Sequence, residues 1–289
     1  MKILVTGSNG YIGSKLIKVL ASKHKIVKFD KKESSVKNLN NKKILNSIFT
    51  KNKIDLVIHL AALAGVEKEE NNYLNYFNNN IKGTFNLLEA MRDHGVNKIL
   101  FASSCSVYGS NDNSKEEDKL NPESFYGLTK IIGEHMIQIY AKKHNFKYNI
   151  FRIFNTIGNG ANSKFNKTRI IPNLINKIQN NKEINLFLRS DSQKTCVRDY
   201  VDIEFVCKVF IKFSNNQTNS ILNIGSGQGY SGEYIAKKLF TILNKTSNIN
   251  YMIKRNGDPD TSISNNSNLI KNKINDSGRS LDQIIKECI

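Results

Sequence analysis

The chain opens with a short apolar run, three closely spaced glycines and an amphipathic segment. Residues 2–6 are mainly β-branched and aliphatic, and residues 14–22 carry apolar side chains at the helical period. Gly7, Gly10 and Gly13 lie between them. In a strand–turn–helix unit the first glycine permits a tight bend, the second lets backbone approach a pyrophosphate, and the third lets helix pack on strand. The pattern therefore predicts a pyrophosphate site at a helix N-terminus.

An acidic residue follows at the distance at which such a unit contacts a ribose. The next apolar run, residues 25–29, is a predicted strand that ends at Asp30, roughly 20 residues past the glycines. A carboxylate there accepts hydrogen bonds from the adenosine ribose hydroxyls, which favours NAD over NADP. Lys31 and Lys32 follow directly and would attract a 2′-phosphate, so NADP is disfavoured without being excluded.

Predicted strands and helices then alternate along the first half of the chain. We expect helices at 44–51, 74–94 and 122–145, and strands at 55–60, 98–103 and 148–154. Such alternation builds a parallel sheet with helices on both faces, and ligands lie outside the carboxyl ends of its strands. The predicted fold class is therefore α/β, a Rossmann-type doubly wound parallel sheet.

The pattern is less regular after Asn155. Helices are predicted at 170–181, 203–213 and 231–243, and strands at 184–188 and 221–224. We interpret 1–155 as an NAD-binding domain and 156–289 as a smaller C-terminal substrate-binding lobe with segments that return to the main sheet. The active site is then expected in the cleft between them.

Composition narrows the function classes. Apolar residues make up 39% and charged residues 24%, as in soluble globular proteins. The 4 cysteines and 5 histidines show neither a disulfide framework nor metal-ligand spacing. The net charge is +18, but the lysines are scattered over predicted solvated faces, so no specific nucleic-acid partner is expected. The opening apolar run is too short for a signal peptide and no run could span a bilayer, so we expect a cytoplasmic protein without membrane contact.

Tyr126 and Lys130 stand four positions apart in the predicted helix 122–145. Residues at this spacing share one helical face, so a phenol and an ammonium can reach the same pocket. A nearby cation favours the phenolate of a tyrosine, whose pKa is otherwise about 10, and such a pair can supply a base near neutral pH. Taken alone, the spacing also fits a half-buried tyrosine beside a solvated lysine.

The order of several segments carries a resemblance to a known family. The segments are Gly7-Ser-Asn-Gly-Tyr-Ile-Gly13, His59-Leu-Ala-Ala62, Asn80, Ser103-Ser-Cys-Ser-Val-Tyr-Gly109, Tyr126 to Lys130, Arg152-Ile-Phe-Asn155, Thr195-Cys-Val-Arg-Asp-Tyr-Val201, Asn223-Ile-Gly-Ser-Gly-Gln-Gly-Tyr-Ser231 and Arg255-Asn-Gly-Asp258. Together they resemble the extended short-chain dehydrogenase/reductases, specifically nucleotide-sugar epimerases of the UDP-glucose 4-epimerase type. The resemblance covers nearly the whole chain.

The resemblance implies a role for each motif residue. NAD would be held by Gly7, Asn9, Gly10, Tyr11, Ile12, Gly13, Asp30, Leu60, Ala61, Ala62, Asn80, Ser103, Tyr126 and Lys130. Tyr126 would remove the sugar 4-hydroxyl proton, Lys130 would lower the pKa of Tyr126, and Ser104 would hydrogen-bond the same oxygen. The nucleotide diphosphate would be held by Asn155, Arg198, Arg255 and Asp258, and Ser262 would border the sugar 2-position.

Plainer interpretations stand beside some of these roles. Asn80 would then bond only backbone within its own helix, Arg198 and Asp199 would form an ion pair, and His59 would be a packing residue. Ser262 would be a solvated turn residue.

The sequence also departs from the family pattern. Relatives usually carry an Asp before the aliphatic residue beside the adenine, and the approximate position here reads Lys43-Ile44. The loop 63–66 lacks the lysine of some 4-epimerases and is closer to the uronate or N-acetyl sugar branches. Asp202 stands where many relatives have His, and the chain is shorter around 160–168 and at its C-terminus. These departures leave the sugar open.

The favoured function is NAD-dependent 4-epimerisation of a UDP-sugar. The substrates would be UDP-glucose and UDP-galactose, and further candidate substrates are the N-acetylated pair. A homodimer that pairs through residues 74–94 and 125–144 is expected. Alternatives are UDP-glucuronate epimerase, a 4-keto reductase and a 4,6-dehydratase, the last disfavoured because Ser104-Cys-Ser-Val lacks an Asp-Glu acid pair. A cofactor-sensing or nucleic-acid-binding scaffold is the non-enzymatic alternative. An intact set of Ser104, Tyr126 and Lys130 argues against it.

Overall fold

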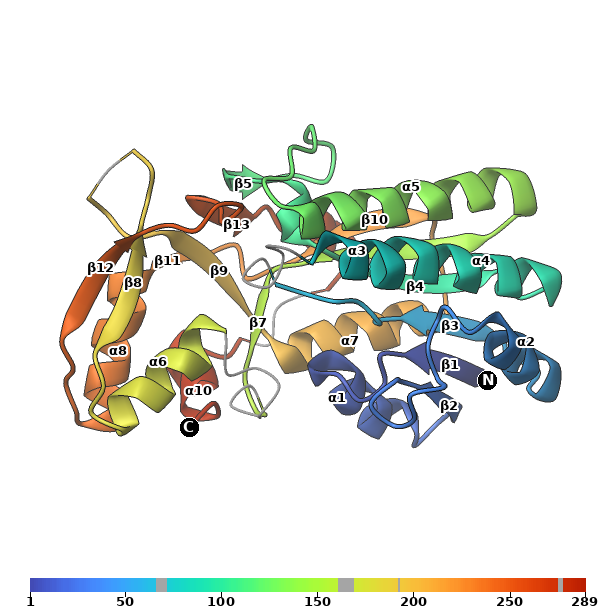
Figure 1. The fold of residues 1–289 in the computed structure, drawn as a ribbon, viewed down its shortest axis with the longest axis horizontal. Coiled ribbons are helices and arrows are strands. Elements are labelled where there is room, and N and C mark those ends of the chain that lie inside the picture. Colours follow the sequence, from blue (N-terminus) through green and yellow to red (C-terminus); the bar gives the residue numbers. More distant parts are fainter. Residues whose placement is uncertain (66–71, 161–168, 192, 275–277) are drawn as a thin grey trace. The chain divides into compact units, whose positions relative to one another are not determined.

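The computed structural model describes residues 1–65, 72–160, 169–191, 193–274 and 278–289 (Figure 1). Contacts among residues divide the chain into two compact units. The first unit comprises Met1–Val107, Ser124–Arg152 and Cys207–Leu222, and the second comprises Tyr108–Glu123, Ile153–Val206 and Asn223–Ile289. The domain boundary expected at residues 155 and 156 stays a prediction.

A six-stranded sheet forms the centre of the first unit. Its order is β10-β6-β4-β3-β1-β2, with β1 at Lys2–Thr6, β2 at Lys25–Phe29, β3 at Leu56–His59, β4 at Lys98–Ser104, β6 at Lys147–Ile153 and β10 at Ser220–Ile224. Strand β1 pairs in parallel with β2 and β3, and β3 pairs in parallel with β4. The chain order reverses beside β1, so the carboxyl ends of β1 and β3 form the switch point at which such sheets bind ligands.

Helices cover both faces of this sheet, with α4 and α5 on one face and α1 and α7 on the other (Figure 1). Their bounds are Tyr11–Leu20 for α1, Lys42–Lys51 for α2, Gly83–Asp93 for α4, Phe125–His144 for α5 and Ile203–Ser214 for α7. The core contains apolar side chains from strands and helices alike, among them Leu4, Val57, Leu88, Ile99 and Ile137. The doubly wound α/β fold predicted from the alternating pattern is confirmed.

The two long helices predicted from periodicity differ in outcome. The predicted helix 122–145 is α5, which begins after Ser124, whose hydroxyl accepts a 3.0 Å hydrogen bond from the Gly127 amide. It ends at Asn145, whose φ of 55° is left-handed. The prediction of one α-helix over 74–94 is wrong in its middle, because α3 (Tyr73–Tyr76) and α4 are joined by a π-helical turn, η1 (Phe77–Lys82). Such a turn adds a residue to the helical repeat, and a side-chain period does not reveal it.

The second unit is built from short strands. Its five-stranded sheet has the order β11-β9-β13-β5 with β7 beside β9, and β12 pairs with β8. The strands are β5 (Asn111–Ser114), β7 (Asn155–Ile157), β8 (Ile184–Leu188), β9 (Val197–Asp202), β11 (Gly229–Ser231), β12 (Ile249–Ile253) and β13 (Thr261–Ser264). The helices are α6 (Ile170–Gln179), α8 (Gly232–Leu243), α9 (Ser267–Lys271) and α10 (Leu281–Lys286).

Buried Asp199 holds several of these segments together. Its carboxylate accepts hydrogen bonds from the backbone amides of Ser226 (2.8 Å), Gly227 (3.0 Å) and Ser264 (3.1 Å). The interpretation of Asp199 as an ion-pair partner of Arg198 therefore does not describe its contacts. A carboxylate that accepts three amide hydrogen bonds fixes the loop after β10 against β9 and β13.

The structure also bears on disulfides, metal sites and membrane spans. The cysteines Cys105, Cys196, Cys207 and Cys288 are free thiols. Among the described residues, no group of three or more His, Cys, Asp or Glu side chains is placed to hold a metal ion. Within the same parts of the chain, none of the helices has the length and hydropathy that a membrane span requires.

Candidate active site

The glycine turn of the first unit requires glycine at two of its three positions. Gly7 has a φ of +70°, and a Cβ there would lie 2.7 Å from the backbone nitrogen of Ala61 and 2.8 Å from the carbonyl carbon of Leu60. A Cβ on Gly13 would overlap the carbonyl oxygen of Gly7. The backbone is therefore packed so closely between β1, α1 and the segment after β3 that only hydrogen atoms fit.

Helix α1 begins directly after this turn. Its N-cap is Gly10, which has no side chain to satisfy the first amides, and Tyr11 and Ile12 begin the helix. Such amides carry partial positive charge and bind phosphate oxygens. This cradle fits the pyrophosphate of a dinucleotide.

Asp30 lies at the end of β2 beside the turn. One carboxylate oxygen accepts a 2.9 Å hydrogen bond from the amide of Asn9, and the other accepts a 2.8 Å hydrogen bond from the amide of Lys32. Asp30 also lines a pocket at the switch point. The pocket is lined by Gly7, Gly10, Phe29, Asp30, Lys31, Lys32, Lys37, Asn38, Leu39, Leu60, Ala61, Ala62 and Asn79. The structure thus brings the predicted glycines, Asp30 and Leu60–Ala62 together.

The approximate adenine-flanking pair, Lys43-Ile44, is not among the residues that line this pocket. Asn38 and Leu39 line the pocket, whereas Lys43 is exposed in the first turn of α2. Helix α2 begins at Lys42, two residues before the predicted start at residue 44, and Asn41 caps it by accepting a 3.2 Å hydrogen bond from the Ile44 amide. Periodicity did not single out Asn38 and Leu39, because no repeating pattern marks this loop.

Lys130 is buried within the sheet–helix core. Its ammonium donates a 2.7 Å hydrogen bond to the carbonyl oxygen of Ala102 on β4 and lies 5.7 Å from the ring centroid of Tyr126. Burial lowers the pKa of Lys130 to about 8, and the charge of Glu134 opposes that effect. The interpretation of Lys130 as a solvated residue is therefore wrong, and the tyrosine beside it is half-buried.

The two serines at the end of β4 point to different partners. Ser104 is buried, and its hydroxyl lies 3.1 Å from the hydroxyl of Ser106 and accepts a 3.2 Å hydrogen bond from the Ser106 amide. The hydroxyl of Ser103 donates to the carboxylate of Glu134. Ser103 therefore bonds an ion pair inside the protein, a contact that its place in the motif did not predict.

Asn80 projects from the π-helical turn η1. Its carboxamide accepts from the Leu63 amide (2.8 Å), donates to the Leu63 carbonyl (3.0 Å) and donates to the Thr129 hydroxyl on α5 (3.0 Å). The interpretation that it bonds only within its own helix is wrong. Asn80 instead joins the segment after β3 to the helix that carries Tyr126 and Lys130.

Tyr76 is a residue near this site that the sequence did not single out. It is buried, its hydroxyl donates a 2.6 Å hydrogen bond to the Gly65 carbonyl, and its ring meets that of Tyr126 edge-on at 6.5 Å. A tyrosine one turn before Asn80 on the same helix was the available signal. The neighbouring residues 66–71, which include the end of the loop 63–66, lie outside the described residues, as do residues 161–168.

His59 is fully enclosed at the end of β3. Its ring nitrogens lie 2.7 Å from the hydroxyl of Thr6 and 3.0 Å from the hydroxyl of Thr84. Burial, followed by the charge of Lys130, lowers the pKa of His59 to about 3. The interpretation of His59 as a packing residue is confirmed.

The second unit carries the residues predicted to bind the nucleotide diphosphate. Arg255 Nε lies 2.8 Å from a carboxylate oxygen of Asp258, and its guanidinium lies 4.9 Å from the ring centroid of Phe187. Arg198 Nη1 donates a 2.8 Å hydrogen bond to the Val197 carbonyl, and Asn155 donates from its carboxamide to the Asp199 carbonyl. Arg255 and Asp258 thus form a pair with each other, which their separate predicted roles did not include.

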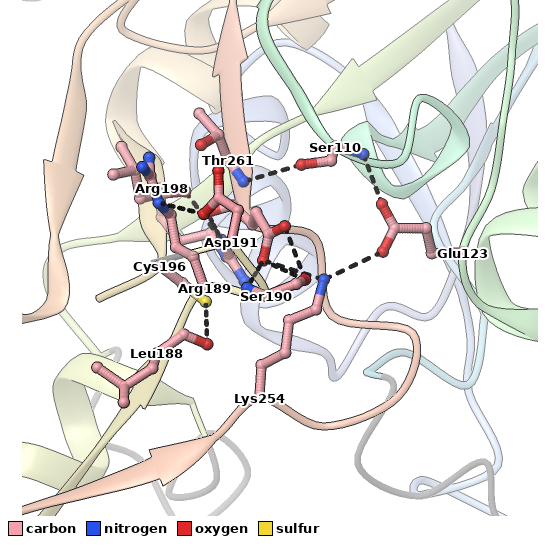
Figure 2. Close-up of polar contacts among 12 residues, drawn as sticks. Ser110, Glu123, Leu188, Arg189, Ser190, Asp191, Cys196, Arg198, Lys254 and Thr261 are labelled. Carbon is pink, nitrogen blue, oxygen red and sulfur yellow. Dashed lines mark hydrogen bonds and ion pairs between the residues drawn. The ribbon is translucent and has the colours of Figure 1, made fainter. Parts of the chain in front are cut away.

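A polar network fixes the segment that carries this pair (Figure 2). Lys254 lies between two carboxylates, 3.1 Å from Asp260 and 3.6 Å from Glu123. Asp260 also accepts a 2.8 Å hydrogen bond from the Ser190 amide. Ser262 follows in β13, where it is 3% exposed and pairs in register with Arg198. Its interpretation as a solvated turn residue is therefore wrong.

Known proteins of similar sequence are nucleotide-sugar enzymes by name. The model of the NAD dependent epimerase/dehydratase family matches residues 3–225. A dTDP-D-glucose 4,6-dehydratase of Dictyostelium discoideum is 32% identical over 83% of this chain, which spans only 62% of that relative's length. A UDP-glucose 4-epimerase of Bacillus subtilis (strain 168) is 30% identical, with 89% of this chain and 87% of the relative covered.

A solved structure extends the similarity to three dimensions. The UDP-glucuronic acid 4-epimerase of Bacillus cereus, in complex with UDP-glucuronic acid and NAD, matches with a TM-score of 0.88 at 26% identity, covering 99% of this chain and 97% of that one. The glycine cradle, Asp30 and the buried Lys130 beside Tyr126 agree with the expected resemblance, which is confirmed at the level of the family. The chain belongs to the NAD dependent epimerase/dehydratase family, and its cofactor is NAD.

Proposed function

We propose that this enzyme catalyses NAD-dependent 4-epimerisation of a UDP-sugar through a 4-keto intermediate. The observation that carries the proposal is the placement of Lys130, which is buried, bonded to Ala102 and 5.7 Å from the Tyr126 ring centroid. A buried cation beside a phenol favours the phenolate, which makes Tyr126 a base. The B. subtilis relative and the B. cereus structure, both of them UDP-sugar 4-epimerases by name, support the choice of reaction.

In this mechanism Tyr126 accepts the proton of the sugar 4-hydroxyl while the C4 hydrogen leaves as hydride, so C4 is oxidised to a ketone by two electrons. When bound, NAD supplies the acceptor of that hydride and its source for the return to the opposite face of C4. Tyr126 then gives its proton back to the 4-oxygen. Ser104 donates a hydrogen bond to this oxygen, and Lys130 keeps the phenolate favoured. No net oxidation occurs.

The binding roles follow the geometry of each unit. In the first unit we assign the pyrophosphate to the amides at the N-terminus of α1 and the adenosine ribose to Asp30. We assign Asn80 a supporting role at the NAD site, because its hydrogen bonds with Leu63 and Thr129 join the segment after β3 to α5. In the second unit we assign the nucleotide diphosphate to the basic side chains of Arg198 and Arg255.

A 4,6-dehydratase is the alternative that the D. discoideum relative raises. That reaction also oxidises C4, but it then eliminates water and needs an acid for the departing hydroxide. The segment after Ser104 is a short 3-10 helix of Cys105–Val107, in which Ser106 bonds back to Ser104. Neither Cys105 nor Ser106 is a carboxylic acid, so the segment favours epimerisation over elimination.

A panel of nucleotide sugars tests the proposal. Purified protein is incubated with UDP-glucose, UDP-galactose, UDP-N-acetylglucosamine, UDP-glucuronate and dTDP-glucose, and products are separated by chromatography. We expect interconversion of 4-epimers of at least one UDP-sugar, without a stoichiometric reductant. A product that has lost water, or a reaction that consumes reduced cofactor in proportion to sugar, would identify a dehydratase or a 4-keto reductase instead.

A further inference from the structure

A buried ion pair lies one helical turn from Lys130 in the first unit. The side chains of Glu134 on α5 and Arg152 on β6 are 1% and 3% exposed. The guanidinium contacts the carboxylate twice, with Arg152 Nη2 2.8 Å from Glu134 Oε2 and Arg152 Nε 3.1 Å from Glu134 Oε1. The hydroxyl of Ser103 donates a further hydrogen bond to Oε1. Groups on two strands therefore bond both oxygens of this carboxylate.

Glu134 follows Lys130 by four residues, the spacing at which lysine and glutamate on one helix attract each other. Among the ion pairs of the described residues, however, the partner of Glu134 is Arg152. Lys130 donates instead to the carbonyl of Ala102. Burial lowers the pKa of Lys130 and the charge of Glu134 opposes this, so the carboxylate acts on the ammonium across space.

We propose that Glu134 is a positioning residue whose charge, held by Arg152 and Ser103, sets how strongly the Lys130 ammonium favours the ionised form of Tyr126. The inference rests on the proposed function, in which Tyr126 is the base. Arg152 is necessary to the arrangement, because a carboxylate released from it would bond Lys130 and draw the ammonium away from Tyr126. Buried charges interact more strongly than charges in water, so one charge added or removed here changes the proton affinity of its neighbours.

Groups on the strands packed against Lys130 supply no competing charge. On β3, His59 is held between the hydroxyls of Thr6 and Thr84, and its pKa of about 3 keeps it neutral at physiological pH. On β4, the ring of Phe101 lies 5.0 Å from the ammonium. The charged groups beside the Lys130 ammonium are therefore Glu134, four residues further along α5, and Arg152 on β6.

Helices α3 and α4 also contact α5. Tyr76 of α3 meets the ring of Tyr126, and its hydroxyl is bonded to a backbone carbonyl. Glu89 of α4 accepts a hydrogen bond from Tyr140 and pairs with Arg92. Tyr140 lies 14 residues beyond Tyr126, or about 20 Å along the helix, so these charges act on the far end of α5.

Two single substitutions change the buried charge in opposite directions. Glu134→Gln removes the negative charge and leaves that of Arg152, so the pH profile of turnover moves to lower pH. Arg152→Gln leaves an unneutralised carboxylate, so the profile moves to higher pH. Each shift is expected to be about one pH unit. The double variant Glu134→Gln/Arg152→Gln should return close to the profile of the unmodified enzyme, and Arg152→Lys, which keeps the charge, should not shift it.

Stability is measured beside turnover, because each single variant leaves an unpaired buried charge. Glu134→Gln keeps the shape of the side chain and one of its two acceptor oxygens, so it carries the test by itself where Arg152→Gln does not fold. The matched control is Asp202→Asn in the second unit, where a buried carboxylate lies 3.1 Å from Arg279. We expect Asp202→Asn to lower the unfolding temperature and leave the pH profile in place. A purely structural role for Glu134 would give the same result as this control.

A second readout needs neither substrate nor turnover. The ionisation of Tyr126 is followed by ultraviolet difference absorbance between each variant and the same variant carrying Tyr126→Phe, which cancels the other tyrosines. Glu134→Gln should move this titration to lower pH. If profiles and titrations superimpose on those of the unmodified protein while Tyr126→Phe still abolishes turnover, this inference fails alone. An active Tyr126→Phe would overturn the proposed function instead.

Discussion

The ammonium of Lys130 donates a 2.7 Å hydrogen bond to the backbone carbonyl of Ala102. Ala102 immediately precedes Ser103 and Ser104 on β4, so this bond fixes the charged end of Lys130 against the strand that carries the predicted catalytic serine. The contact also explains how a lysine that is 4% exposed retains a partner in the core. The bond therefore holds the Lys130 ammonium next to the end of β4.

The depressed pKa of Lys130 predicts a pH dependence of stability with a definite sign. Between the folded value of about 8 and the usual value of 10.5, the unfolded chain holds this proton and the folded protein has lost it. Because the unfolded state then binds more protons, the contribution of Lys130 to the free energy of unfolding rises with pH across this interval. Denaturant unfolding of the unmodified protein and of Lys130→Met at several pH values should show that the free energy of unfolding of the first rises with pH relative to that of the second. Parallel curves for both proteins would contradict the prediction.

Tyr126→Phe should lower turnover about a hundredfold or more, the usual scale for losing a general acid or base. NAD binding and the unfolding temperature should change little, because the ring and its edge-on contact with Tyr76 remain. Steady-state kinetics, calorimetry with NAD and thermal unfolding check the three parts. Tyr140→Phe, at the other end of α5, is the matched control and should keep normal turnover. Near-normal turnover of Tyr126→Phe would remove this residue from the mechanism.

Asp30 should make NAD bind more tightly than NADP by about tenfold or more, because its carboxylate repels a 2′-phosphate. Both of its oxygens are held by backbone amides, so the charge stays at the end of β2. Asp30→Asn should reduce the preference, and calorimetry with both cofactors measures it. Lys31→Ala and Lys32→Ala should leave the preference in place. Equal affinities for the two cofactors in the unmodified protein would mean that these lysines outweigh the carboxylate.

Ser262 predicts acceptance of 2-acetamido sugars. The small side chain is buried in β13, in register with Arg198. We propose that it borders the sugar 2-position, where a large aromatic would fill the space that an acetamido group needs. The unmodified enzyme should therefore epimerise UDP-N-acetylglucosamine as well as UDP-glucose. Ser262→Tyr should abolish the first activity and spare the second, while Ser262→Ala should keep both. Chromatography of both reactions decides, and equal loss of the two activities would refute the prediction.

The first unit should form a homodimer through α3, η1, α4 and α5. Large apolar side chains are exposed along these helices: Tyr73, Leu74, Phe77, Phe85, Leu128 and Ile139. Leu74 is 71% exposed, and burying such residues against a second copy removes apolar surface from water. Light scattering should give about twice the 32.8 kDa of one chain. The variant Leu74→Glu/Ile139→Glu should be monomeric, and a monomer at micromolar concentration for the unmodified protein would rule the dimer out.

Local spacing allowed much of the first unit to be predicted. The strand at 2–6 and the glycines after it recur as β1 and a turn in which a Cβ on Gly7 or Gly13 would meet backbone. Four residues along a helix is a fixed geometry, so Tyr126 and Lys130 share a face in any fold that keeps α5. The strand, the order of the glycines and the helical spacing depend on neighbours in sequence, which is why the residues alone determined them, whereas the backbone that a Cβ on Gly7 would meet belongs to the distant residues Leu60 and Ala61.

Only the tertiary structure determined the features that depend on contacts between residues far apart in sequence. The short strands β5, β9 and β13 carry polar residues without alternation, and they are strands because they pair with one another. Asn38 lies at the pocket because the Asn41 cap fixes the start of α2. Glu134 bonds Arg152, 18 residues away on β6, in place of the lysine one turn before it on its own helix. Sequence spacing favours the local pair, and only the packing of α5 against the sheet, which brings the guanidinium and the Ser103 hydroxyl to one carboxylate, selects the distant one.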